Sequence, residues 1–172
     1  MNIPVFISVG SRLTAHQQGI YEFFCEQMET IFDLDPRTVG KTDLAMRPPL
    51  NEVLALAQHC AGALILGFEE FQIKEGKRAS KSEVPDSKND LTGTAWSTPW
   101  NQIEAGICKA LRLPMMIFAE GVSGGIFEVG SSDLFIQRLP NIEDFEKNKK
   151  SINATITNWS GAVQRFYYAG LD

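Results

Sequence analysis

The stretch Ala61–Leu66, with the sequence AGALIL, decides the fold class. It has no polar side chain, and Gly67 ends it at the length of a strand that is buried on both faces. Such a strand belongs in the interior of a parallel sheet, because the helical crossovers between parallel strands cover both faces. The stretch therefore predicts an α/β protein.

Strand and helix signatures alternate on both sides of this stretch. Further strands are predicted at Val5–Ile7, near Thr38–Val39, at Pro114–Phe118 and at Leu134–Ile136. Apolar residues at helical spacing predict four helices, with apolar positions from Ile20 to Phe32, Val53 to Ala57, Trp100 to Leu111 and Ile152 to Tyr167. In the third helix we expect Ile103 and Ile107 to face the sheet.

This alternation predicts one domain over residues 1–172, a doubly wound α/β fold with a mostly parallel sheet of about five strands and flavodoxin-like winding. Val5–Ile7, Ala61–Leu66 and Pro114–Phe118 are expected at the centre of the sheet. The segment from about 68 to 95 interrupts the alternation, because it is polar and has no sustained period. We expect a long irregular and mobile loop there, acting as a lid or an assembly surface.

The charge of the chain narrows the function classes. The formal net charge is −5, from 16 basic and 21 acidic residues that are mixed along the chain. Direct binding of nucleic acid is not expected, because phosphate neutralisation requires a basic face. The small cluster of Lys74, Lys77, Arg78 and Lys81 is diluted by acids and is read as a solvated loop. No apolar run approaches the roughly 20 residues of a membrane span, and the start has no charged leader, so we expect a cytoplasmic protein without membrane contact.

The cysteines and histidines do not form a reactive or metal-binding pattern. Cys25, Cys60 and Cys108 have no short spacing, and each falls on a predicted helix or at its end. We expect them to pack as small hydrophobic residues in a reducing compartment. His16 and His59 give no recognisable pairing with a cysteine or a carboxylate cluster, so neither a metal site nor a bound cofactor is predicted.

The segment Trp96–Gly106, with the sequence WSTPWNQIEAG, carries the strongest signal for a functional site. Thr98 suits an N-cap and Pro99 suits the first helical position, so a helix is predicted to begin there. Glu104 falls in the second turn and shares a face with Trp100, four residues earlier. Ligands of doubly wound sheets bind outside the carboxyl ends of the strands, where the long polar loop and this helix start are expected. Glu104 is therefore the candidate catalytic residue, and a solvated surface glutamate is the alternative.

Two motifs resemble Toll/interleukin-1 receptor (TIR) domains. Val5–Ser8, with the sequence VFIS, resembles the opening strand of those domains. Thr98–Glu104 resembles their second box, in which a serine precedes a tryptophan by two residues, a cysteine follows the tryptophan, and a glutamate comes four residues after it. Here Thr98 stands at the serine position and Asn101 at the cysteine position, and the Phe-Trp pair of the third TIR box is missing.

The same helix, running into Leu113–Ile117, also resembles nucleoside 2-deoxyribosyltransferases, which share this architecture and place a catalytic glutamate similarly. The acidic residues that usually precede the catalytic helix in that family are replaced here by Trp96, Ser97 and Thr98. This departure weakens the deoxynucleoside reading more than the TIR reading.

Both resemblances imply cleavage of a ribosyl C–N bond. The favoured function is cleavage of the ribosyl–nicotinamide bond of NAD, as hydrolase or cyclase, with an ionised Glu104 opposing the positive charge of an oxocarbenium-like sugar. We expect the N-terminal region of the helix to keep this carboxylate ionised. NAD is then a substrate and not a cofactor. The TIR resemblance also implies a homo-oligomer and, for bacterial members, a role in anti-phage defence. The alternatives are a deoxyribosyltransferase and a silent nucleotide sensor or interaction module.

The predicted partner is a small-molecule nucleotide. Small residues and a guanidinium in the turn after the first strand suit a phosphate, and aromatic rings near the helix start suit a base. Arg47 is included because TIR domains have a mobile loop near the pocket at that place. The candidate substrate-binding residues are Ser8, Gly10, Ser11, Arg12, Arg47, Phe68, Trp96, Ser97, Trp100 and Asn101. For the turn, the alternative is a polar connection with Arg12 in solvent.

Overall fold

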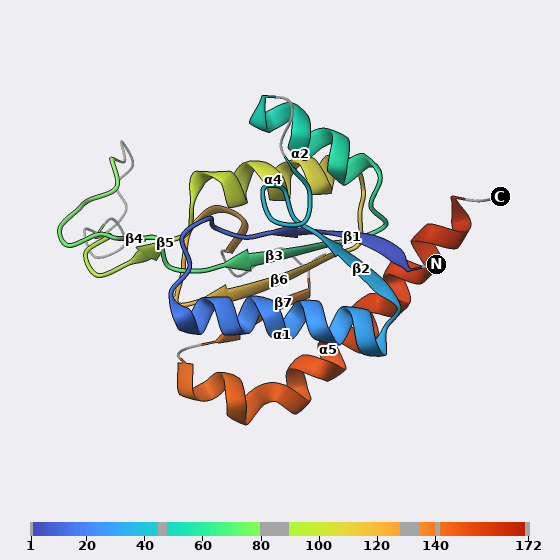
Figure 1. The fold of residues 1–172 in the computed structure, drawn as a ribbon. Helices are drawn as coiled ribbons and strands as arrows, with labels where there is room; N and C mark the ends of the chain where they lie inside the picture. Colours follow the sequence, from blue (N-terminus) through green and yellow to red (C-terminus); the bar gives the residue numbers. More distant parts are fainter. Residues whose placement is uncertain (1, 45–47, 80–89, 128–134, 140–141, 171–172) are drawn as a thin grey trace.

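A parallel β-sheet lies between two layers of helices in the computed structural model of the chain (Figure 1). The structure describes residues 2–44, 48–79, 90–127, 135–139 and 142–170. The strands, in spatial order, are β2 (Leu34–Arg37), β1 (Ile3–Ser8), β3 (Ala63–Gly67), β6 (Met115–Glu120) and β7 (Phe135–Leu139). One face is covered by α1 (Ala15–Ile31) and α5 (Ile142–Ala169), and the other by α2 (Pro49–Gln58) and α4 (Pro99–Ala110). The predicted doubly wound α/β class is confirmed.

The three strands expected at the centre of the sheet are there. β3 pairs in parallel with β1 on one side and with β6 on the other, and every residue of β3 is buried. The chain winds from β1 to β2 in one direction and from β3 to β6 in the other. The winding therefore reverses between β1 and β3, and the carboxyl ends of these strands form the edge where doubly wound sheets bind ligands.

Alternation along the central strands separates two cores. Val5 and Ile7 pack on the side of α1 and α5, whereas Phe6 packs on the side of α2 and α4. Because successive side chains of a strand point to opposite faces, Ser8 shares the side of Phe6. The last side chain of β1 thus faces the layer that contains α4.

The short strand predicted near Thr38–Val39 is misplaced, because β2 ends at Arg37. Thr38 instead accepts backbone hydrogen bonds from the turn at residues 41–43. Pro36 lies within β2, where its missing N–H is tolerated because β2 is an edge strand that pairs only with β1. The aspartates and prolines in and around β2 are typical of loops, so the sequence did not predict this strand.

The described part of segment 68–95 contains one short ribbon, and most of its other residues lie in turns or irregular stretches. β4 (Phe71–Gln72) pairs antiparallel with β5 (Ala95–Trp96), and the ribbon is extended by a 2.9 Å bond from Ile73 N to the Thr94 carbonyl. Figure 1 shows this ribbon projecting beyond the sheet. Residues 80–89 lie outside the described residues, as does Leu134 of the predicted last strand, so the mobile lid or assembly surface stays a prediction.

The inward face of α4 differs from the one expected. Its buried residues are Asn101, Ala105 and Cys108, whereas Ile103 is 43 % exposed. Ile107 packs partly against this core, as expected, whereas Ile103 turns away from it. A buried hydrogen bond of Asn101, described below, sets the rotation of the helix. In α5 the residues at helical spacing from Ile152 to Val163 are buried as expected, and Phe166 beyond them is exposed.

The three cysteines are free thiols that pack as expected. Cys60 and Cys108 are buried and Cys25 is partly buried. Burial raises the pKa of the Cys60 and Cys108 thiols to about 12, which keeps both protonated at neutral pH. Within the described ranges no helix has the length and apolar character needed to cross a membrane.

We expect Gly67→Ala to lower the free energy of unfolding by about 1–3 kcal/mol, because overpacking a closed core forces its neighbours to shift. A Cβ at Gly67 would lie 2.2 Å from the ring of Phe127, which is fully buried. Gly19→Ala is the matched control in α1, where an added Cβ meets nothing within 4 Å. That change should stabilise the protein by about 0.5–1 kcal/mol, and urea unfolding measures both. Equal effects at the two positions would contradict the packing of Phe127 against β3.

Candidate functional site

The site lies where the start of α4 meets the carboxyl ends of β1 and β3. β1 ends at Ser8 and β3 at Gly67, and α4 packs against both strands. The turn after β1 passes close to α4, since a Cβ at Gly10 would lie 3.6 Å from Cγ2 of Thr98 and 3.9 Å from a carboxylate oxygen of Glu70. The edge where the winding reverses is therefore lined by the segments that the sequence indicated.

The predicted start of α4 is confirmed in its capping geometry. Thr98 is the N-cap in extended conformation, and its side chain accepts a 3.2 Å hydrogen bond from the Asn101 backbone N–H. Pro99 occupies the first helical turn, where its fixed φ and missing N–H are tolerated. The cap fixes where the helix begins, and so where Glu104 falls.

A directional chain of hydrogen bonds connects the cap to β1. The Thr98 hydroxyl donates to Oδ1 of Asn101 at 3.1 Å, and Nδ2 of Asn101 donates to Oγ of Ser8 at 2.7 Å. Asn101 is 2 % exposed and Ser8 is 1 % exposed. Because Nδ2 of Asn101 donates to Ser8 Oγ, the hydroxyl proton of Ser8 is left to bond Glu104.

Glu104 is partly buried, and its carboxyl is the most perturbed acid of the site. Burial raises its pKa from an ordinary 4.5 to about 7, and the hydrogen bond from Ser8 opposes this rise only in part. With a pKa of about 7 the protonated and ionised forms are both populated at neutral pH, so the fully ionised carboxylate expected from the sequence stays a prediction. Glu104 lies in the second turn, and the favourable field of the helix dipole falls off within the first turn.

A glycine-rich turn after β6 closes one side of the site. Gln102 holds it, since Oε1 of Gln102 accepts from Ile126 N at 2.9 Å and its Nε2 donates to the Gly124 carbonyl at 3.4 Å. Gly124 has a φ of +86°, and a Cβ there would lie 2.5 Å from the ring of Trp96. The close contact therefore requires glycine. Sequence reasoning missed Gln102, although the two adjacent glycines marked a tight turn.

The structure brings together some of the predicted substrate-binding residues and separates others. Ser8 and Asn101 are buried and hydrogen-bonded to each other, and Ser97 is buried just before the N-cap of α4. Gly10 lies close to Thr98, and Trp96 lies close to Gly124. Ser11 and Arg12 are exposed in the turn after β1, and Trp100 is 44 % exposed. Phe68 is 4 % exposed and packs in the core on the side of α1 and α5, which favours a packing role. Arg47 lies outside the described residues.

A second polar pair at this edge was not found from the sequence. Nε2 of His16, in the first turn of α1, lies 3.1 Å from Oε1 of Glu120, the last residue of β6. Gln17 approaches the same carboxylate at 3.5 Å. The partners are 104 residues apart, and no local pattern links them. In the described part of the chain, no group of three or more histidine, cysteine or acidic side chains is placed to hold a metal ion.

No protein-family model matches the chain, and no curated protein matches it. The resemblances to TIR domains and to deoxyribosyltransferases therefore depend on the short motifs at β1 and α4, and they stay predictions.

We expect Glu104→Gln to stabilise the protein at high pH and to do so progressively less as the pH falls. Because the folded-state pKa is about 7 and the ordinary value is 4.5, the folded protein retains a proton that the unfolded chain releases between these values. The stability contributed by protonated Glu104 is thus complete below pH 4.5 and is lost as the pH rises through 7. The free energy of unfolding of the variant, taken relative to that of wild type, should rise by about 2 kcal/mol between pH 4 and pH 8.

Urea unfolding at both pH values measures this gain. Glu26→Gln, at an exposed position of α1, controls for the change in net charge. A gain for Glu104→Gln that equals the control at both pH values would show that Glu104 is solvated.

Proposed function

We propose that the chain is a nucleotide-binding N-glycosidase that cleaves the ribosyl–nicotinamide bond of NAD, as hydrolase or cyclase, with Glu104 as the catalytic carboxylate. The observation that supports this most is the environment of Glu104. Its carboxyl is shielded from water at the edge where the winding reverses, and the Ser8 hydroxyl orients it.

The chemistry of the bond suits a single carboxylate. When the C–N bond breaks, its electron pair moves to the nicotinamide ring nitrogen, so the positively charged pyridinium becomes neutral and needs no proton from an acid. The positive charge moves to the ribose as an oxocarbenium-like centre, which water or a hydroxyl of the substrate then attacks. An ionised Glu104 in a poorly solvated site would stabilise the positive charge as it develops on the ribose during this step.

Neighbouring segments supply contacts for the rest of such a substrate. The turn from Gly10 to Arg12 offers backbone N–H groups and a guanidinium to phosphates. Trp100, exposed one turn before Glu104, offers a ring to a base or to the pyridinium. The free thiols support a cytoplasmic location, and the resemblance to TIR domains supports a homo-oligomer, with anti-phage defence as the proposed setting.

Incubation with NAD is expected to release nicotinamide, and Glu104→Gln should lower this rate by about 10²–10³-fold with little change in NAD affinity. Trp100→Ala should weaken binding as well as turnover, because it removes contact surface rather than charge. Single-turnover chromatography and NAD titrations on the two variants measure these effects. Assays over a range of protein concentrations are needed because an assembled form is proposed.

Parallel incubations with deoxynucleosides separate the alternatives. Exchange of bases without release of nicotinamide would instead indicate a deoxyribosyltransferase. Saturable binding of NAD without turnover at any protein concentration would indicate a sensor. Turnover that survives Glu104→Gln unchanged would overturn the catalytic assignment.

The rate of NAD cleavage is expected to rise with pH through about 7, because the ionised form of Glu104 is the competent one. Ser8→Ala should move the midpoint of this profile to higher pH, since it removes the hydrogen bond that lowers the pKa of Glu104. It also leaves Asn101 Nδ2 without its acceptor, which costs about 1–3 kcal/mol of stability, so the profile is recorded after folding has been verified. A rate that falls as the pH rises would indicate that Glu104 acts as an acid instead.

A further inference from the structure

The side chain of Asn101 is buried between two hydroxyl groups of the site. Asn101 is 2 % exposed, and its amide bonds to Thr98 at one end and to Ser8 at the other. The sequence predicts that Asn101 binds substrate, but so little of it is exposed that the structure favours a role through its neighbours. The direction of its two hydrogen bonds indicates what that role is.

Thr98 determines which way the amide of Asn101 points. Oγ1 of Thr98 accepts from the backbone N–H of Asn101 at 3.2 Å, and its own proton goes to Oδ1 of Asn101 at 3.1 Å. Because the carbonyl end of the amide is held on this side, the N–H₂ end faces Ser8 and donates to its Oγ at 2.7 Å. A flipped amide would leave the Thr98 proton without this acceptor, so the observed orientation is favoured.

The orientation of the amide decides where the Ser8 proton goes. A hydroxyl has one proton, and because Ser8 Oγ accepts from Asn101, that proton is directed to the carboxyl of Glu104. A carbonyl oxygen of Asn101 in the same place would accept the Ser8 proton and so remove the donor from Glu104. The hydroxyl at the start of α4 is thus connected to the carboxyl through two intervening side chains.

We propose that Thr98 and Asn101 are positioning residues, which orient the Ser8 hydroxyl so that it donates to Glu104. They act through Ser8 and not on the substrate. The inference rests on the proposed function only in treating Glu104 as catalytic, because the direction of the bonds is a property of the protein without substrate. For the reaction, this orientation increases the share of ionised Glu104, the competent form, near neutral pH.

The other titratable groups around α4 do not explain the state of Glu104. The elements β1, β3 and η1 (Gly125–Phe127), which pack against α4, have no acidic, basic or thiol side chain. Cys108 lies one turn further along α4, and its pKa of about 12 keeps the thiol neutral. Glu70 and Arg12 are exposed near the turn after β1, and neither contributes to the raised pKa of Glu104.

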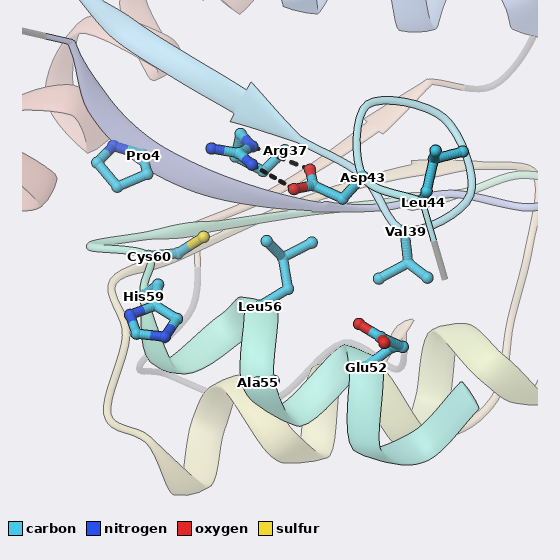
Figure 2. A pocket seen from close by; sticks show the side chains of 10 residues that line it. All are labelled: Pro4, Arg37, Val39, Asp43, Leu44, Glu52, Ala55, Leu56, His59 and Cys60. Atoms are coloured by element: carbon cyan, nitrogen blue, oxygen red, sulfur yellow. Dashed lines mark hydrogen bonds and ion pairs between the residues drawn. The ribbon is translucent and has the colours of Figure 1, made fainter. Parts of the chain in front are cut away.

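The helix α2 also packs against α4, but its acid Glu52 belongs to a separate region. Glu52 lines a groove of about 500 Å³ beside α2, and Figure 2 shows its carboxylate turned toward Val39. Arg37 and Asp43 line the same groove, where Nε of Arg37 donates to Oδ2 of Asp43 at 2.9 Å. This ion pair raises the pKa of Arg37 and lowers that of Asp43. No residue of the groove beside α2 is among the groups that shift the pKa of Glu104.

NMR titration of the side-chain carboxyl carbon of Glu104 tests the proposal, with Glu104→Gln used to assign the resonance. Thr98→Val keeps the shape of the side chain and removes the hydroxyl, so the two orientations of the Asn101 amide become about equally favourable. Ionised Glu104 then competes with this second orientation for the Ser8 proton. We expect the midpoint to rise by about 0.3 pH units, which corresponds to a factor of two. Thr98→Ser retains the hydroxyl and should keep the wild-type midpoint.

The sign of the shift separates this role from a purely structural one. Loss of the N-cap alone would loosen the start of α4, expose Glu104 to water and lower its midpoint, because burial is what raises it. Thr14→Val removes the corresponding cap of α1 and should leave the midpoint unchanged. The proposal would be overturned by a lower or unchanged midpoint in Thr98→Val, or by an equal rise in Thr98→Ser or Thr14→Val.

A double variant tests whether the effect passes through Ser8. Ser8→Ala should raise the midpoint by roughly 0.5–1 pH units, and adding Thr98→Val should raise it no further, because no hydroxyl is left to orient. A further rise equal to that of the single variant would contradict this route. Urea unfolding identifies the folded variants, and if the double variant does not fold, the comparison of Thr98→Val with Thr98→Ser decides alone.

These titrations use no NAD, so the two proposals can fail separately. An absence of NAD cleavage would leave the measured midpoints and the positioning role intact. Midpoints that do not move would remove the positioning role and leave the catalytic assignment of Glu104 to the cleavage assays.

Discussion

The hydrogen bond from Asn101 to Ser8 is the contact on which the arrangement of the site depends. It joins the first turn of α4 to the last residue of β1, and both side chains are almost fully buried. Breaking it would leave a buried amide donor without a partner, at a cost of about 1–3 kcal/mol. Because Asn101 points inward, Ala105 and Cys108, which follow at helical spacing, also face the sheet and pack on it. The same rotation of the helix places Glu104 at the edge of the sheet beside Ser8. One polar contact thus sets both the packing of the helix and the place of the carboxyl.

The state of Glu104 follows from the relative size of two effects. The Ser8 hydroxyl favours the charged form, and burial disfavours it. Burial is the larger effect, so the pKa of the carboxyl lies well above its ordinary value in the isolated protein. A cation placed beside it would reverse the balance, because opposite charges interact more strongly where water is excluded. In the proposed reaction the positive charge that moves to the ribose provides that cation, so ionisation of Glu104 and bond cleavage would support each other.

Signals that were local in the sequence predicted the structure well. The apolar run at Ala61–Leu66 gave the central strand, and Thr98 with Pro99 gave the start of α4, because each depends on a few adjacent residues. The features that the sequence did not indicate depend on distant partners. The ribbon joins the two-residue strands β4 and β5, which lie more than twenty residues apart, and His16 meets Glu120 across the chain. The inward face of α4 was misread because a buried polar residue set its rotation in place of the apolar stripe.

The site around Glu104 and the groove beside α2 lie on the same side of the sheet, and they differ in how the charge of their carboxyl groups is compensated. This difference limits what each region can do. In the groove beside α2, Asp43 is ionised at neutral pH because it forms an ion pair with Arg37. A ligand there would meet a compensated ion pair and not an isolated charge. At Glu104, the Ser8 hydrogen bond is the one contribution from the described residues that opposes burial, so ionising the carboxyl in the folded state is unfavourable below about pH 7. Sites that carry out chemistry commonly retain such unfavourable groups, because a transition state of opposite charge can relieve them. By this physical criterion Glu104, and not the groove beside α2, is where a reaction is to be sought.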